Sequence, residues 1–150
     1  MKVSVERRGT AAIFSLDGPL TVEADTRRLR ALVGSITQHA ACDVVLDFTR
    51  VGRLDCSGIG QLVEIHTLTC RRGGGLVLVN VGRRLERLLN LAGLLIVFPV
   101  FATLNEALDW CGAAETQDRL FPRPRIVWAT MAGAARVVEP PARHLTQHAG

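Results

Sequence analysis

The chain has 150 residues, 48% of them apolar, which corresponds to one ordinary domain and is too apolar for a disordered chain. Its formal net charge of +4 comes almost wholly from arginine, and residue 2 is the only lysine. Because the charge is modest and aromatic residues, which stack on bases, make up only 5% of the chain, we do not expect direct binding to nucleic acid.

The first third of the chain shows strand patterns on either side of one helix pattern. Apolar residues at alternate positions predict two strands, over 3–5 and 12–16, joined by a turn at Gly9. A helix is expected over 21–39, and its first residue is of an N-capping type. The almost fully apolar run at 44–48 predicts a strand of the kind that is buried on both faces of a sheet.

In the remainder of the chain, helix and strand patterns alternate up to residue 110 and become weak beyond it. We expect a helix opened by Asp55 and Ser57, a strand over 76–79, a helix over 83–92, a strand at 97–98 and a helix over 103–110. This order predicts an α/β fold with a mixed, mostly parallel β-sheet. Beyond it, four prolines and a weak periodicity predict a C-terminal extension over 111–150, partly disordered or docked on the domain of residues 1–110.

The cysteines and the hydropathy pattern indicate a cellular compartment. The four cysteines lie far apart and form no metal-binding or redox motif. The N-terminus lacks the apolar segment of a signal peptide, and the longest charge-free stretch, 88–101, is shorter than the roughly 20 residues that a membrane span needs. We therefore expect a cytoplasmic protein with reduced thiols, no membrane span, no metal and no cofactor.

The segment 46–60 is the part of the sequence that points to a function. It reads as a buried strand, a short link and a polar turn that opens a helix. Ser57 falls at the helix start, where backbone N–H groups have no partner within the helix, and such a site tolerates a phosphate. Gly58 and Gly60 are expected to leave the surface around the hydroxyl open to a partner. Simple capping of the helix by Asp55 or Ser57 explains the same residues.

The same segment resembles the signature of the STAS domain family of anti-sigma factor antagonists. The resemblance rests on Asp47-x-Thr49-x-Val51-x-x-Leu54-Asp55-x-Ser57-Gly58-Ile59-Gly60, and further on Gly74-Gly75-Leu76-x-Leu78, Leu88-Leu89-x-Leu91-Ala92-Gly93-Leu94, Phe98-Pro99-Val100-Phe101 and Leu104-x-Glu106-Ala107-Leu108. It runs from about Val3 to Trp110. It implies a STAS-like fold, a curved mixed sheet with about four helices packed against one side.

The resemblance also implies a function, that of a binding protein and not an enzyme. Such a protein binds an anti-sigma factor and thereby frees a sigma factor. In the family the anti-sigma factor is a serine kinase that phosphorylates the serine carried over to Ser57, and a serine phosphatase is expected to reverse the modification. The implied partner-binding residues are Thr21, Asp55, Cys56, Gly58, Gly60, Gln61 and Glu64. One departure is the loop Gly18-Pro19-Leu20-Thr21, where many members have Gly-Glu-Leu-Asp.

Other functions remain open at this point. Other STAS domains are non-switching scaffolds in stress-signalling complexes or soluble accessory subunits of transporters, including lipid transporters. An enzyme would need a base beside Cys56 or Ser57, and His66 lies about two and a half turns further along the same expected helix. The arginines at 83, 84 and 87 fit a contact with a partner or with anionic lipid, and equally a solvated helix face.

Overall fold

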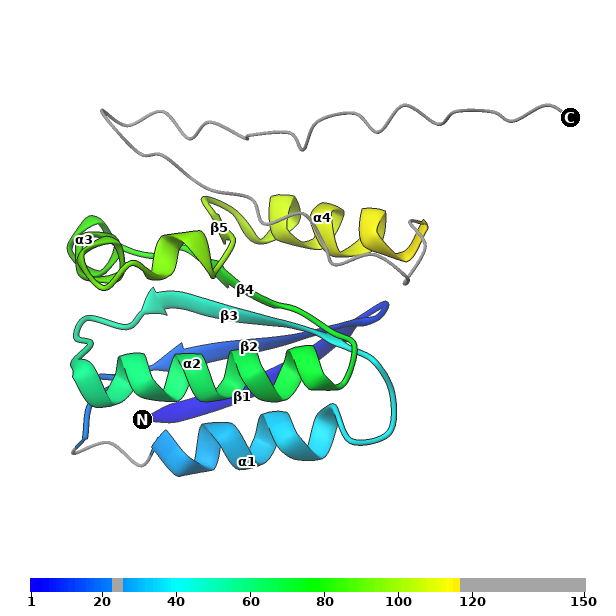
Figure 1. Cartoon of the computed structure of the whole chain (residues 1–150), viewed down its shortest axis with the longest axis horizontal. Helices are drawn as coiled ribbons and strands as arrows, with labels where there is room; N and C mark the ends of the chain where they lie inside the picture. The colour runs from blue at the N-terminus through cyan, green and yellow to red at the C-terminus, as the bar shows by residue number, and fades with distance from the viewer. Residues whose placement is uncertain (23–25, 117–150) are drawn as a thin grey trace, which may run out of the picture.

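The computed structural model describes residues 1–22 and 26–116, which form a β-sheet with helices on both faces (Figure 1). The strands are β1 (Lys2–Arg8), β2 (Ala11–Asp17), β3 (Asp43–Arg50), β4 (Leu76–Val79) and β5 (Val100–Phe101). The helices are α1 (Thr26–Ile36), α2 (Cys56–Arg71), α3 (Arg83–Leu91), the 3₁₀ helix η1 (Leu94–Ile96) and α4 (Leu104–Thr116).

The strands lie in the sheet in their chain order, β1-β2-β3-β4-β5. β1 and β2 form an antiparallel hairpin, whose turn contains Gly9 with a φ of 58°, in the left-handed region that glycine adopts most easily. The pairs β2–β3, β3–β4 and β4–β5 are parallel. The predicted α/β fold with a mixed, mostly parallel sheet is therefore confirmed.

The two faces of the sheet carry separate hydrophobic clusters, because side chains alternate along each strand. Phe14, Leu46 and Leu78 point to the face that α1 and α2 cover, and leucines of α3 join that cluster. Ile13, Val45 and Val77 point to the opposite face, where Ala107 and Cys111 of α4 cover them. The expectation that all helices pack on one side is wrong, since strands that are apolar on both faces need cover on both.

The first helix begins later than its sequence pattern predicts. Residue 20 instead continues the parallel pairing of β2 and β3 beyond their ends, because Leu20 forms an isolated parallel bridge with Leu54. Thr21 is buried at 2% exposure and lies five positions before α1, so it is not the N-cap of that helix. Residues 23–25, which fall within the expected helix range, lie outside the described residues.

The predicted strand at 97–98 is also displaced. Gly93, with a φ of 70°, ends α3, and the chain then tightens into η1. Phe98 is fully buried in the core beneath the sheet. The strand β5 follows only at Val100–Phe101, where Asn80 N–H donates to the carbonyl of Phe101 at 3.2 Å.

The last helix begins as expected and ends later. Thr103 and Glu106 form the predicted capping box, with reciprocal hydrogen bonds of 3.3 Å between backbone and side chain. The helix does not stop near Trp110 but continues to Thr116, and Cys111 is buried against the sheet. We therefore propose that the domain extends past residue 110, to about Thr116. The rest of the expected extension, 117–150, lies outside the described residues.

Candidate functional site

Two loops at the carboxyl end of neighbouring parallel strands form the candidate site. One follows β2 and contains Leu20; the other follows β3 and leads into α2. The N–H of Leu20 donates to the carbonyl of Arg53 at 2.9 Å, and the N–H of Asp55 donates to the carbonyl of Leu20 at 3.3 Å. This end of an open α/β sheet is where loops held by a rigid scaffold commonly bind partners or ligands. The backbone bonds make the two loops one unit.

The carboxylate of Asp55 completes this connection. Asp55 is the N-cap of α2, and its Oδ1 accepts from the N–H of Gly58 at 2.9 Å. Its Oδ2 accepts from the N–H of Val22, on the other loop, at 3.0 Å. The hydrogen bonds from Gly58 and Val22 lower the pKa of Asp55 from its ordinary value. Ionised Asp55 therefore caps the helix and joins the two loops at the same time. The sequence predicts the cap but not the connection between the loops.

A pH-dependent effect on stability is expected from Asp55. Because its pKa is lower in the folded than in the unfolded protein, its stabilising effect is complete above the unfolded value of about 4 and disappears as the pH falls through the folded value. Replacing Asp55 by alanine should thus lower the thermal unfolding midpoint at neutral pH. The difference from the unmodified protein should shrink in acid, as followed by circular dichroism.

The control for this experiment is Asp17→Ala. Asp17 is exposed and makes a 3.3 Å ion pair with Arg50 on the surface, a kind of interaction that contributes little to stability. Its replacement should change the midpoint only slightly at neutral pH. An equal loss for Asp55→Ala at neutral and acid pH would show that the ionised form of its carboxylate is not what stabilises the loops.

Gly58 has a different role from the one its sequence predicts. It is buried, and a Cβ built on it would lie 2.1 Å from the carbonyl oxygen of Leu20 and 2.7 Å from Cδ1 of Leu54. Gly58 thus does not open the surface but allows the two loops to pack closely. Gly60 is exposed, and nothing lies within 4 Å of its Cβ position, as expected for an accessible surface.

The remaining predicted site residues lie on the first three turns of α2, apart from Thr21. Ser57 is the second residue of the helix and is half-buried, and Cys56 beside it is exposed. Gln61 is half-buried and its Oε1 is buried without a hydrogen-bond partner among the described residues. Glu64 is exposed and pairs with Arg30 of α1 at 3.3 Å. Thr21 is buried, so its side chain offers no accessible surface.

The first part of the motif has a structural task. Oδ1 of Asp47 accepts from the N–H and the hydroxyl of Thr49, at 3.0 and 2.6 Å, and from the amide of Asn80 at 3.1 Å. Burial raises the pKa of Asp47, but the hydrogen bonds from Thr49 and Asn80 outweigh burial and hold it below its ordinary value. Asp47 thereby connects β3 to Asn80, the residue that follows β4.

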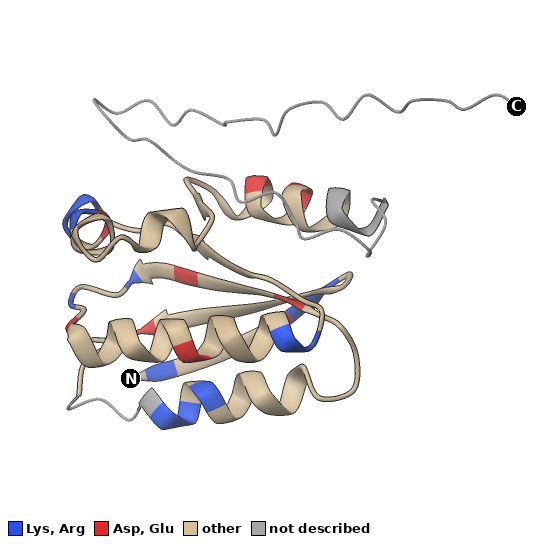
Figure 2. Cartoon of the chain, viewed as in Figure 1, with Lys and Arg blue, Asp and Glu red and all other residues tan. Residues whose placement is uncertain are grey.

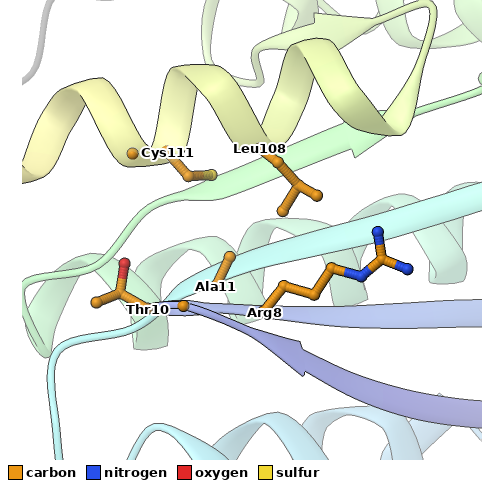
Figure 3. A pocket seen from close by; sticks show the side chains of 7 residues that line it. Arg8, Thr10, Ala11, Leu108 and Cys111 are labelled. Atoms are coloured by element: carbon orange, nitrogen blue, oxygen red, sulfur yellow. The ribbon is translucent and has the colours of Figure 1, made fainter.

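The structure places the candidate base and a shallow pocket away from Ser57. His66 has its ring edge against Phe98, with centroids 5.4 Å apart, and its ring nitrogens lie 3.6 and 3.7 Å from Sγ of Cys70. The pocket, between the β1–β2 turn and α4, is lined by residues such as Arg8, Thr10 and Leu108 (Figure 3). It lies at the start of β2, the end of the sheet opposite to the Ser57 turn.

Two further classes of feature, a metal site and a membrane-spanning helix, are absent from the described residues. Over 1–22 and 26–116, no group of three or more histidine, cysteine or acidic side chains is arranged to hold a metal ion. In the same part of the chain, no helix has the length and apolarity needed to cross a membrane.

Comparisons with known proteins agree on one family. Residues 2–107 match the family model of the STAS domain. A relative from Paenibacillus polymyxa, named anti-sigma F factor antagonist, is 24% identical over 109 residues, which cover 72% of this chain and 92% of that protein. The crystal structure of an anti-sigma factor antagonist from Mycobacterium paratuberculosis matches with a TM-score of 0.65 and 22% identity, over 74% of this chain and 93% of the other.

A third similar protein is a phosphorylated one. The Bacillus cell fate determinant SpoIIAA in its phosphorylated form matches with a TM-score of 0.58 and 22% identity, over 73% of this chain and 98% of the other. At identities below 25%, these two solved structures demonstrate a shared fold.

Some residues of the site have no recognisable sequence pattern. Leu20 and Val22 contribute only backbone groups to the loop connection, and such groups exist at every position. Arg30 meets Glu64 only because α1 and α2 pack side by side. The sequence does indicate that the two loops lie close together, because both follow apolar strands that we expected to be parallel.

Proposed function

Because the chain belongs to the STAS domain family, we propose that it is an anti-sigma factor antagonist, a regulatory protein that binds an anti-sigma factor and so frees a sigma factor. The name of the Paenibacillus relative supports this role. The observation that carries the proposal is the pair of loops held together by Asp55, which presents Ser57 on the first turn of α2. Such a turn suits recognition by another protein.

The partner surface, in this proposal, is the first three turns of α2. Cys56, Gly60 and Glu64 are exposed there, and Ser57 and Gln61 are partly accessible between them. Asp55 contributes by holding the turn in place, and Gly58 by letting Leu20 pack beneath it. Thr21, being buried, shapes the adjacent loop from within.

We further propose that the partner is a serine kinase that phosphorylates Ser57 and that a serine phosphatase removes the phosphate. Ser57 lies in the first turn of α2, where the first intrahelical bond is the one from the N–H of Ile59 to the carbonyl of Asp55, at 2.9 Å. The backbone N–H groups of residues 56 and 57 therefore have no acceptor within the helix. The N–H of Ser57 interacts with the carboxylate of Asp55, and the helix N-terminus as a whole still favours an anion, so we expect the domain to carry a phosphate without unfolding.

Charge reversal at Glu64 tests the proposed surface. We expect Glu64→Arg to weaken the complex with the anti-sigma factor at least tenfold, because it places a second cation beside Arg30 within the contact area. The complex is to be captured with the tagged protein from its native host and its affinity measured by calorimetry. Since Glu64 is exposed, the circular dichroism spectrum should not change.

The matched control is Asp109→Arg. Asp109 is exposed on α4, on the opposite face of the sheet, and its replacement changes the net charge by the same amount. This variant should bind as the unmodified protein does. Equal weakening by both variants would indicate a general effect of charge, and full binding by Glu64→Arg would place the interface elsewhere.

A further inference from the structure

A second surface lies on α3 and on the turn that follows it. Arg84, Arg87 and Leu91 are three and four positions apart, which places them on one face of α3. Leu85 and Leu89 are buried on the opposite face. Figure 2 shows the basic residues of α3 gathered at one corner of the molecule. We call Arg83, Arg84, Arg87, Leu91 and Ile96 the α3 corner.

The apolar members of the α3 corner are unusually accessible. Leu91 is 85% exposed and Ile96, at the end of η1, is 53% exposed. Ala92 and Gly93 between them are exposed as well, and no charged residue occurs from 88 to 101. Two large exposed aliphatic side chains, at the end of α3 and at the end of η1, therefore lie on either side of an uncharged turn that follows a basic helix.

The charges of this corner are nearly all positive. Arg83, Arg84 and Arg87 are exposed, and between residues 83 and 105 the only acidic residue is Glu86, which is half-buried. An arginine guanidinium binds phosphate groups through two parallel hydrogen bonds. A cationic cluster next to projecting aliphatic side chains is the combination that binds the boundary between lipid headgroups and acyl chains.

We infer that the α3 corner docks on an anionic lipid surface, with the three arginines on lipid phosphates and with Leu91 and Ile96 inserted among the acyl chains. A bilayer is favoured over a folded protein because the two aliphatic side chains, at the ends of α3 and η1, are exposed to solvent and do not line a pocket. A bilayer receives projecting side chains anywhere on its surface, whereas a protein partner would need a matching pocket beside an acidic patch. This inference does not depend on the role proposed for Ser57.

Sedimentation of the full chain with lipid vesicles tests the inference. The protein should bind vesicles of phosphatidylcholine and phosphatidylglycerol but not vesicles of phosphatidylcholine alone, and salt should weaken the binding. Replacing Arg84 and Arg87 together by glutamine should lower the partition coefficient about thirtyfold, the factor that two basic residues contribute near an anionic membrane. Leu91→Ser should weaken binding while the preference for anionic lipid remains.

The matched control replaces Arg27 and Arg28 by glutamine, because both are exposed on α1 and the net charge changes equally. This variant should bind the anionic vesicles as the unmodified protein does. An equal loss in the control would reveal an unspecific attraction by net charge and overturn the inference. The inference would also be overturned if the unmodified protein did not bind anionic vesicles. The same holds if the α3 variants bound vesicles normally and lost only the binding of a protein partner.

Discussion

Phosphorylation of Ser57 is expected to weaken binding of the anti-sigma factor more than about a hundredfold, which corresponds to a loss of about 3 kcal/mol. The phosphate adds a charge of about −1.5 to −2 and three acceptor oxygens. Asp55 is two residues away and is already ionised, because its hydrogen bonds to Gly58 and Val22 lower its pKa. An interface that fits the small hydroxyl would have to desolvate this charge or be displaced by it.

Two substitutions at Ser57 reproduce the two states. Ser57→Asp is expected to bind poorly with an unchanged circular dichroism spectrum, and Ser57→Ala to bind constitutively. Ser4→Asp, an exposed position on the edge strand β1, adds the same charge outside the proposed partner surface and should bind normally. Affinities are to be measured by calorimetry, and phosphate on Ser57 by mass spectrometry of the protein from its native host.

One result would replace the switch by a different role. If Ser57→Asp and Ser57→Ala bound alike and phosphate never appeared on Ser57 under several growth conditions, the modification would have no part in function. A non-switching scaffold or a transporter accessory subunit would then be the better proposal.

Most of the fold follows from local sequence patterns. The alternation of residues 11–17 and the apolar run at 44–48 define β2 and β3, and Thr103 with Glu106 defines the start of α4. What local patterns could not supply is the covering of the second sheet face by α4. That arrangement depends on which helix is left once α1 and α2 have covered the first face, and this is a property of the whole chain.

The sequence predicts where the candidate site lies but not how its two loops pack together. Ser57 and Asp55 lie at the start of α2, as their sequence indicates, because capping is a local effect. The close packing of Gly58 on Leu20 joins residues that are 38 positions apart in the chain, so no local pattern reveals it. For the same reason Thr21 and Gly58 were assigned to the surface although both are buried.

The close approach of the two loops makes Gly58 intolerant of a side chain. In Gly58→Ala the new Cβ would lie 2.1 Å from the carbonyl oxygen of Leu20, which is held in place by its hydrogen bond from the N–H of Asp55. The loops must separate, and both this bond and the one from Val22 to Asp55 are strained. Overpacking of this kind costs roughly 1–3 kcal/mol. For a domain of about 100 residues, we therefore expect the thermal unfolding midpoint to fall by roughly 5–15 °C.

The matched variant Gly60→Ala should act in the opposite direction. Gly60 lies two residues further in the same helix and has nothing within 4 Å of its Cβ position, so alanine only improves helix propensity, by about 0.5–1 kcal/mol. Circular dichroism should show a higher midpoint for Gly60→Ala and a lower one for Gly58→Ala. If both unfolding midpoints rose, Leu20 would be able to move away from the new Cβ without loss of stability. The two loops would then not be the rigid unit on which presentation of Ser57 depends. Gly58→Ala should also bind the anti-sigma factor less well, because the displaced loop carries Asp55 and the start of α2 with it.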